Sequence, residues 1–319
     1  MNKLINTPVL LSLIVPVVKP ELFLEKLFIS LSNLKHEQIE LVLINQSGKE
    51  IDLLRKILNI KLVEYVRNRV IPAAEARNLG ASLASGKYLF FLDDDAVVYS
   101  PSTSIEQLII NLLNSPDVVI VQRGELNINN NYVSHWPDNT IKVNYRNFPR
   151  IVIEWNLIIK RELFLELGGF CNVGTGCHHA ALSGEAFVLF AKIISHTKKI
   201  ELFPQILVAH PSLFATVKPT KSSLGYAYGN GYAVGTALKY FSYTIKTYWL
   251  VRFLVSTLFY DILRSKKEYT IVNEDVNYLK YRFAIFKCKI FGFIDSIFQK
   301  EPRTLNWLLK ETNQVINNT

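Results

Sequence analysis

Residues 73–95 read AAEARNLGASLASGKYLFFLDDD, and this stretch decides the fold. Its alanine-rich first half, together with Pro72, predicts a helix over residues 72–84 with proline near its first turn. Residues 88–92 predict a short buried strand. That strand runs directly into three acidic residues, Asp93, Asp94 and Asp95. A helix followed by a buried strand is typical of a βαβ unit, in which ligands bind beyond the carboxyl ends of the strands. The aspartates therefore mark a candidate ligand site.

The chain up to residue 122 repeats this alternation. Apolar runs predict further strands at residues 10–15, where Pro16 ends the run, and at 41–44, 62–66 and 118–121. Helical spacing of apolar residues predicts helices at 21–34, 51–58 and 105–113. This pattern predicts an α/β fold with a mostly parallel sheet that helices cover on both faces. Loop and edge structure is expected at 123–150, further alternating elements at 151–210, and helices from about 220 onward.

The composition favours a cytoplasmic protein. With 319 residues, 49% of them hydrophobic, the chain can form one large domain or a domain of roughly 200 residues with an appendage. Residues 9–18 contain Ser12 and Pro16, and they predict a strand in place of a signal peptide or anchor. Three cysteines are too few for a disulfide framework and predict a reducing setting. Zinc is disfavoured because no Cys-x₂-Cys pair occurs among Cys171, Cys177, His178 and His179.

The net charge of +9 is concentrated in the last third of the chain. From Pro211 to the end, 15 lysines and arginines face 7 acidic residues, and residues 243–263 and 278–298 mix these cations with aromatic side chains. Both stretches are too short or too charged to predict a transmembrane helix. They predict helices on an anionic membrane surface, with a helical cap on the first domain or an oligomer contact as alternatives. Nucleic acid is disfavoured, because the cations are embedded in apolar helices.

The aspartate triplet has the chemistry of a metal site. In an extended chain alternate side chains point the same way, so Asp93 and Asp95 are expected to face one ligand. Asp94 is expected to face away or to bind a ribose. Two carboxylates on one face repel each other unless a cation lies between them. Oxygen ligands favour Mg²⁺ or Mn²⁺, which often join carboxylates to substrate phosphates. A solvated turn is the alternative for an isolated triplet.

Several motifs surround the triplet in a recognisable order. They are SLIVPV at 12–17, ARNLG at 76–80, GKYLFFLDDD at 86–95, LGGF at 167–170, GTG at 174–176, SGE at 183–185 and AHP at 209–211. Together they resemble glycosyltransferase family 2, whose members have the GT-A fold. The resemblance covers about residues 9–212. It continues more weakly through YGNG at 228–231, which is similar to an element of polysaccharide-assembly members.

The resemblance implies a role for each matching residue. Asp93 and Asp95 match the pair that holds a divalent metal and the diphosphate, and His210 matches a further metal ligand of some members. Nucleotide-sugar-binding positions of the family match Pro16, Asn45, Arg77 and Asp94. Asn45 stands where the family usually has an aspartate that reads the nucleobase, so the choice of nucleotide stays open. The alternatives are a structural histidine at position 210 and an exposed helix charge at position 77.

The resemblance also implies a general base, which an inverting transfer needs to deprotonate the acceptor hydroxyl. The family commonly places it in an acidic pair after glycine, and here Gly184 is followed by Glu185 and Ala186. The first acid is present, but alanine occupies the place where many members hold the base. Three alternatives stay open: Glu185 is the base in a shifted arrangement, the base lies elsewhere, or activity is lost.

The resemblance implies an inverting glycosyltransferase that uses a nucleoside-diphosphate sugar, Mn²⁺ or Mg²⁺, and a surface-glycan or lipid-linked glycan acceptor. The expected domains are a GT-A domain over residues 1–215 and a helical, basic-aromatic extension over 216–319. The expected location is cytoplasmic, peripheral at the inner face of the cell membrane. A catalytically degenerate module that binds nucleotide sugar or scaffolds glycan assembly is the alternative. A nucleotidyltransferase is disfavoured, because residues 16–20, PVVKP, contain no glycine-rich phosphate loop.

Overall fold

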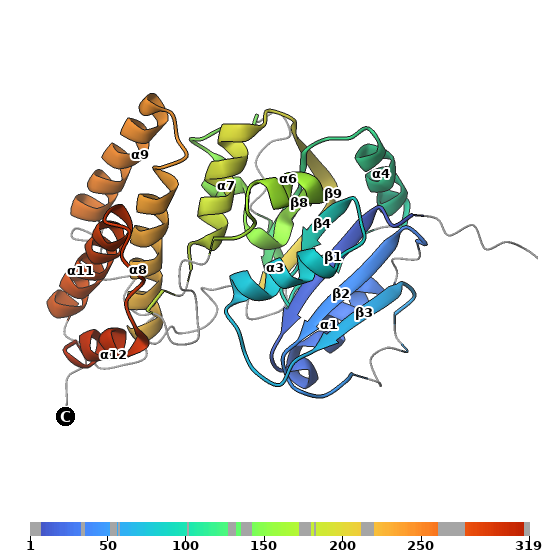
Figure 1. Cartoon of the computed structure of the whole chain (residues 1–319), viewed down its shortest axis with the longest axis horizontal. Coiled ribbons are helices and arrows are strands. Elements are labelled where there is room, and N and C mark those ends of the chain that lie inside the picture. The colour runs from blue at the N-terminus through green and yellow to red at the C-terminus, as the bar shows by residue number, and fades with distance from the viewer. Residues whose placement is uncertain are drawn as a thin grey trace, which may run out of the picture. The chain divides into compact units, whose positions relative to one another are not determined.

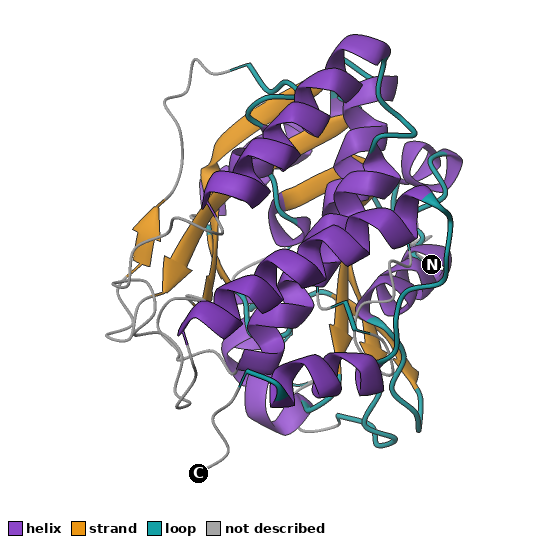
Figure 2. Cartoon of the chain, turned by 90° about the vertical axis from the view of Figure 1, so that its left-hand side faces the viewer, coloured by secondary structure: helices purple, strands orange, loops and turns teal. Residues whose placement is uncertain are grey.

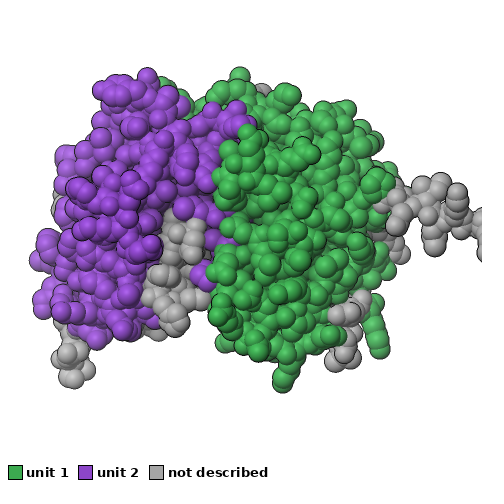
Figure 3. All heavy atoms as spheres, viewed as in Figure 1, with its two compact units in different colours: residues 1–71, 75–169, 197–212 green, residues 72–74, 170–196, 213–319 purple. Residues whose placement is uncertain are grey.

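The computed structural model describes residues 8–32, 36–51, 56, 58–100, 102–126, 132–134, 142–171, 180–181, 183–211, 220–260 and 278–315. Contacts between Cα atoms divide the chain into two compact units (Figure 3). Unit 1 consists of residues 1–71, 75–169 and 197–212, and unit 2 of residues 72–74, 170–196 and 213–319. Segment 170–196 groups with the C-terminal helices, and the domain boundary at residues 215–216 stays a prediction.

Unit 1 is built on one sheet (Figure 1). Its strands follow the order β3 (Lys61–Val66), β2 (Ile39–Asn45), β1 (Leu11–Val17), β4 (Tyr88–Phe91), β8 (Leu157–Lys160), β6 (Val118–Leu126), β9 (Ile200–Pro211) and β5 (Val97–Tyr99), and β7 (Tyr132–Ser134) pairs with β6. The first four strands in this order pair in parallel, as the sequence predicts. β8 is antiparallel to both β4 and β6. The predicted α/β fold is confirmed, and the parallel pairing is concentrated in its first half.

Helices cover both faces of this sheet. α1 (Pro20–Leu31) and α4 (Ser102–Leu113) pack on the face of β1 that carries Leu13 and Val15. α3 (Ala73–Leu83) packs on the opposite face, where a Cβ at Gly80 would overlap the side chain of Ile14. Successive strand residues point to opposite faces, so the unbroken apolar run of β1 supplies both layers. Each fully buried leucine or phenylalanine in them contributes about 1.5–3 kcal/mol. Short helices follow at α5 (Phe148–Ile151), η1 (Glu154–Asn156) and α6 (Arg161–Glu166).

Of the two extents predicted for the first strand, residues 10–15 are too short and residues 9–18 agree better with β1. β1 continues through Pro16 to Val17 and stays paired with β2. The carbonyl oxygen of Ile14 accepts a hydrogen bond from the N–H of Leu92, at 3.0 Å, on the side of β4. Pro16, two residues further on, turns its nitrogen to the same side, where β4 has already ended. The missing N–H therefore has no strand opposite it, and proline is tolerated there.

A buried carboxylate joins the amino ends of the parallel strands. Glu40, at the start of β2, is 1% exposed. It accepts hydrogen bonds from the hydroxyls of Ser12 and Ser85, at 2.7 and 2.8 Å, and from the N–H of Ser85, at 2.7 Å. Lys61, at the start of β3, donates to it at 3.1 Å. Burial alone would raise the pKa of Glu40, but these hydrogen bonds outweigh burial and lower it. One charge thus holds the starts of three strands and the segment that leads into β4.

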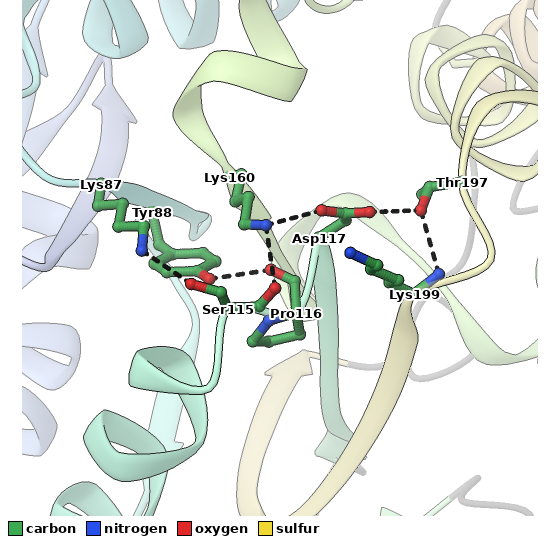
Figure 4. Close-up of polar contacts among 8 residues, drawn as sticks. All are labelled: Lys87, Tyr88, Ser115, Pro116, Asp117, Lys160, Thr197 and Lys199. Atoms are coloured by element: carbon green, nitrogen blue, oxygen red, sulfur yellow. Dashed lines mark hydrogen bonds and ion pairs between the residues drawn. The ribbon is translucent and has the colours of Figure 1, made fainter.

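A second polar network joins the amino ends of β4, β6 and β9 to the end of the antiparallel β8 (Figure 4). Asp117 accepts hydrogen bonds from the ammonium group of Lys160, at 2.8 Å, and from the hydroxyl of Thr197. The Tyr88 hydroxyl donates to the carbonyl of Pro116 at 2.9 Å. Burial disfavours the charge on Asp117, but the bonds from Lys160 and Thr197 prevail and lower its pKa. Both networks lie at the edge of the sheet opposite to the one where the aspartates follow β4.

Unit 2 contains the later helices (Figure 2). They are α7 (Glu185–His196), α8 (Thr220–Ala237), α9 (Tyr243–Val255), which continues into η2 (Ser256–Tyr260), α11 (Tyr278–Ile297) and α12 (Leu305–Asn313). Among the helices in the described ranges, none is both long enough and apolar enough to span a bilayer. The helical character predicted from about residue 220 onward is confirmed for residues 220–260 and 278–315.

α8 and α11 approach each other backbone to backbone. A Cβ at Gly231 would overlap the carbonyl oxygen of Lys289, and a Cβ at Gly292 would overlap that of Tyr228. Only glycine allows two helices to come so close. The sequence YGNG at 228–231, similar to an element of polysaccharide-assembly members, is therefore part of a helix–helix contact in this structure.

An ion pair holds the end of the chain against α11. Asp295 is 2% exposed and accepts hydrogen bonds from the guanidinium of Arg303, at 2.6 Å, and from the hydroxyl of Tyr228, at 3.1 Å. The Arg303 guanidinium lies 4.2 Å from the ring centre of Phe291 and 4.8 Å from that of Trp307. The charge of Asp295 is thus compensated inside unit 2, and cation–π contacts add to the ion pair.

Three predictions fall wholly or mostly outside the described residues. They concern the helix at 51–58, the turn at 174–176 and the disfavoured zinc cluster with Cys177, His178 and His179.

Candidate active site

The three aspartates lie in a turn at the carboxyl edge of the sheet. β4 ends at Phe91, and the N–H of Ala96 donates to the carbonyl of Asp93 at 3.1 Å before β5 begins. The extended conformation predicted for the triplet is therefore wrong. The chain bends instead, because β5 must turn away from β4 to pair with β9 at the other end of the sheet. Asp93 and Asp95 still converge, because both contact the same histidine.

That histidine, His210, comes from β9. β5 pairs antiparallel with β9, and Val97 lies opposite Ala209. The same register carried one residue further sets His210 beside the aspartate turn. Its Nε2 atom lies 3.0 Å from an oxygen of Asp95 and 3.5 Å from an oxygen of Asp93. The ligand atoms that these three residues offer all lie within 4.8 Å of one another. The sequence resemblance grouped these residues, and the structure brings them together.

The second ring nitrogen of His210 is also engaged. Nδ1 lies 2.9 Å from the carbonyl oxygen of Pro211, to which it can donate only as N–H. In the neutral ring this hydrogen bond leaves the lone pair on Nε2, turned toward Asp93 and Asp95. Fixing the tautomer through the other nitrogen is how proteins commonly prepare a histidine to bind a metal.

The electrostatics of the cluster favour a positive charge at its centre. Burial favours neutral His210, but the hydrogen bond to Asp95 and the charges of Asp95 and Asp93 raise its pKa to about 9. Asp94, between the other two aspartates, has its pKa raised to about 7 by burial and then by the charges of Asp95 and Asp93. Two carboxylates and one imidazole are a donor set that suits Mg²⁺ or Mn²⁺. The residues present therefore fit the predicted divalent ion.

Arg77 lies beneath the aspartate turn. Its side chain is 5% exposed, so an exposed helix charge is ruled out as its description. The guanidinium donates to one carboxylate oxygen of Asp93 at 2.6 Å, while the other oxygen of Asp93 faces His210. Glu154 lies 3.9 Å from the same guanidinium nitrogen. In this structure Arg77 orients Asp93, and its contact with a nucleotide sugar, at the diphosphate or the base, stays a prediction.

Trp155 supports His210 and was missed by sequence reasoning. The two rings stack with their centroids 5.6 Å apart and their planes at 11°. Trp155 is 5% exposed and follows Glu154 in the short helix η1, just before β8. The only signal in the sequence was a tryptophan two residues before the apolar run 157–159, which core packing explains equally well.

Asn45 and Pro16 lie at the same edge of the sheet as the aspartates. Asn45 ends β2, and its side-chain amide donates to the carbonyl of Lys49, at 2.6 Å, and to Glu64, at 2.7 Å. Its side-chain oxygen accepts a hydrogen bond from the N–H of Ser47 at 3.0 Å. Asn45 thus orders the turn after β2 and links it to β3, and its contact with a nucleobase stays a prediction.

Glu185 is the first residue of α7, in unit 2. It is 6% exposed, and Gly184 before it has φ +119°, which an L side chain rarely adopts. A Cβ at Gly184 would lie 2.7 Å from the Cβ of Ala233, so glycine also permits the start of α7 to pack on α8. Glu185 is therefore buried at the end of α7 that packs on α8, and its role as the base stays a prediction.

Comparison with known proteins identifies the family. The family model described as "Glycosyl transferase family 2" matches residues 12–183, just over half of the chain. The chain belongs to glycosyl transferase family 2. A relative named "Uncharacterized glycosyltransferase", from Haemophilus influenzae, is 38% identical over 96 residues, which span 28% of this chain. That match spans 37% of the relative's own length.

Solved structures with the same fold include TarS of S. aureus. The crystal structure of TarS 1–349 has a TM-score of 0.60 at 15% sequence identity, and the match covers 91% of each chain. The same segment in complex with UDP-GlcNAc has a TM-score of 0.58 at 15% identity and covers 91% of each chain. At this identity the likeness concerns the fold, and it confirms the GT-A fold class expected for a family 2 member.

Proposed function

We propose that the protein transfers a sugar from a nucleoside-diphosphate sugar to a hydroxyl group of a surface-glycan acceptor, with inversion at the anomeric carbon. The observation that carries the proposal is the convergence of Asp93, Asp95 and His210 within 4.8 Å at the carboxyl edge of the sheet. Folds of this kind bind their ligands at that edge. TarS, whose fold this chain shares, has been crystallised with UDP and with UDP-GlcNAc, which supports a nucleotide-sugar donor.

The donor half of the reaction depends on the aspartate–histidine cluster. Asp93, Asp95 and His210 would hold Mn²⁺ or Mg²⁺, and the bound ion would offset the negative charge that develops on the departing diphosphate. Arg77 keeps one oxygen of Asp93 turned toward His210. Stacking on Trp155 holds the His210 ring in its orientation. We assign Asp94 to the ribose and Asn45 to the nucleobase. Pro16 and Arg77 complete the proposed nucleotide-sugar site.

The acceptor half depends on Glu185, which we propose as the general base. Its carboxylate takes the proton of the acceptor hydroxyl while that oxygen attacks the anomeric carbon. The new glycosidic bond forms as the bond from this carbon to the diphosphate oxygen breaks, and the proton ends on Glu185. Attack opposite to the leaving group inverts the configuration. Support comes from the burial of Glu185 and from Gly184, whose lack of a side chain lets the start of α7 pack on α8.

We further propose a glycan or lipid-linked glycan as the acceptor and the inner face of the cell membrane as the place of reaction. The sequence similarity to polysaccharide-assembly members supports this assignment. The excess of 15 basic over 7 acidic residues from Pro211 to the end of the chain also supports it, because lipid-linked acceptors lie at an anionic surface.

A second candidate is a degenerate module that binds nucleotide sugar without turning it over. The observation in its favour is Ala186, which occupies the place where the acidic pair of the family has its second member. Such a module would keep the metal and nucleotide affinity of the cluster and would scaffold a glycan-assembly complex.

The proposal is tested by incubating the protein with a panel of nucleotide sugars, with and without Mn²⁺, and measuring release of the nucleoside diphosphate. We expect turnover that requires the metal and falls about 100-fold or more in Asp95→Ala. Glu185→Gln should lower turnover by about 10²- to 10⁴-fold and retain nucleotide binding. Glu106→Ala, an exposed carboxylate on α4, is the matched control and should keep full activity.

Turnover without metal, or full turnover in Asp95→Ala, would contradict the proposed mechanism. Metal-dependent nucleotide binding with no turnover of any donor would instead favour the degenerate module. A thermal-shift screen of nucleoside diphosphates with Mn²⁺ separates these outcomes, because a ligand that binds only the folded state raises the unfolding temperature.

A further inference from the structure

The helix α9 and its continuation η2 have two apolar faces. One face carries Trp249 and Phe253, which are 5% and 4% exposed. The other carries four residues that are between 42% and 53% exposed, Val251, Leu254, Val255 and Leu258. These four follow the spacing i, i+3, i+4 and i+7, so they form one stripe along the helix. A helix that only packed against the other helices of unit 2 would need the face with Trp249 and Phe253. It would carry polar residues in place of the exposed apolar stripe.

α11 repeats this arrangement beside α9. The rings of Phe253 and Phe293 stack at 4.6 Å, and Lys289 reaches Ser256 at 3.3 Å, so the two helices are neighbours. On α11, Leu279 is 75% exposed and Phe283 is 67% exposed, one helical turn apart. We call these two residues and the stripe of α9 the α9–α11 face. Six large apolar side chains exposed on two neighbouring helices exceed the scattered exposed leucines of an ordinary surface.

The exposed charges on α9 and α11 are all positive among the described residues. Residues 243–260 contain no aspartate or glutamate, and residues 278–297 contain only Asp295. Asp295 is 2% exposed and paired with Arg303, so it adds no negative charge to the surface. Lys246 on α9 and Lys280 on α11 are exposed. Helices α9 and α11 therefore combine the apolar α9–α11 face with exposed cations, and their described residues include no exposed carboxylate.

We infer that the α9–α11 face docks on an anionic phospholipid bilayer. A second copy of the chain is a poorer occupant, because a two-fold contact pairs a surface with itself and would bring cations against cations. A bilayer with anionic headgroups complements both features at once: its acyl region accepts the leucine, valine and phenylalanine side chains, and its phosphates attract the lysines. The helices then lie in the plane of the interface. This inference rests on the proposed function for its purpose, which is to hold the enzyme near a lipid-linked acceptor.

The test is co-sedimentation of the purified full chain with vesicles, without donor, acceptor or metal. Neutral vesicles contain phosphatidylcholine alone, and anionic vesicles contain about one-third phosphatidylglycerol. Two double variants probe the face, Leu254→Gln with Phe283→Gln and Lys246→Ala with Lys280→Ala. Leu22→Gln with Ile110→Gln is the matched control, because these residues are 64% and 61% exposed on helices of unit 1. Circular dichroism shows that each variant is folded.

We expect the wild type and the control to bind anionic vesicles in preference to neutral ones. The lysine variant should bind the anionic vesicles about 30-fold more weakly. The glutamine variant should also bind weakly, and high salt should release the wild type. Equal binding to both kinds of vesicle, or wild-type binding by both double variants, would overturn the inference. A dimer that the glutamine variant dissolves would assign the face to a second copy and overturn it as well.

Vesicle binding and sugar transfer can fail separately. Release of nucleoside diphosphate in solution should be unchanged in both docking variants, because neither alters the aspartate–histidine cluster. Vesicle binding by a protein that turns over no donor would leave the docking face in place and refute the enzyme. Turnover by a protein that ignores anionic vesicles would refute the docking face and leave the enzyme in place.

Discussion

Replacing Trp155 by leucine should weaken metal binding although Trp155 is not itself a ligand. The tryptophan ring stacks on His210 with centroids 5.6 Å apart and planes at 11°, and His210 offers Nε2 to the proposed metal site. A stacked aromatic pair contributes about 0.5–1.5 kcal/mol beyond the area it buries. That energy corresponds to roughly 2- to 13-fold in a binding constant. Loss of a residue that orients a ligand typically costs about 10- to 100-fold in metal affinity, so we expect about tenfold weaker Mn²⁺ binding.

The same substitution also removes buried volume, and the two effects have to be measured apart. Trp155 is 5% exposed, so the smaller side chain should lower the free energy of unfolding by about 2–4 kcal/mol. Mn²⁺ binding to the folded protein, followed by electron paramagnetic resonance without donor, reports the affinity. Trp307→Leu is the control, because this tryptophan packs against Phe291 in unit 2, with ring centroids 6.0 Å apart. It should lose stability and keep its Mn²⁺ dissociation constant. An unchanged dissociation constant in Trp155→Leu would show that Trp155 is a core residue without influence on the metal site.

Three further predictions concern the scaffold. Glu40→Gln should lower the free energy of unfolding at pH 7, because the Glu40 carboxylate stabilises the fold only when it is ionised. The difference from wild type should vanish as the pH falls through the lowered pKa of Glu40. Urea unfolding at several pH values measures this difference, and a difference that is independent of pH would contradict the prediction. Gly231→Ala should lower the free energy of unfolding by about 1–3 kcal/mol, because its Cβ would overlap the backbone of Lys289 in α11; equal stability by chemical denaturation would contradict the close packing. Asp117→Asn should lower the unfolding temperature and leave the Mn²⁺ dissociation constant unchanged. A weaker Mn²⁺ affinity would contradict the view that the Asp117 network stabilises the strands without influencing the proposed metal site.

The parallel half of the fold could be predicted because its signals are local. β1, β2 and β4 are short apolar runs bounded by turn residues, and the helices between them have clear spacing. Asp93 and Asp95 could be singled out because they follow a buried strand, and a parallel sheet places ligands beyond such an end. Even Pro16, which on local grounds predicts the end of β1, is explained once the end of β4 is known.

The rest depends on pairings between distant segments. β5 has three residues and is a strand only because β9 lies beside it, and that pairing is what brings His210 to the aspartates. Trp155 and His210 stack although 54 residues separate them along the chain, and no periodic pattern in the sequence predicts a contact between positions so far apart. Likewise, the sequence of α9 does not show which of its two apolar faces is buried. The structure shows that Trp249 and Phe253 are buried and that the stripe from Val251 to Leu258 is exposed.

The placement of the two polar networks has a consequence for how such an enzyme can change over evolutionary time. Glu40 and Asp117 fix the alignment of the strands at one rim of the sheet, and both lie away from the aspartate turn. Loops at the opposite rim can therefore be exchanged, lengthened or given new side chains while the strands keep their alignment. A lineage built on this scaffold can acquire a preference for another sugar or another nucleotide through substitutions that leave its folding intact.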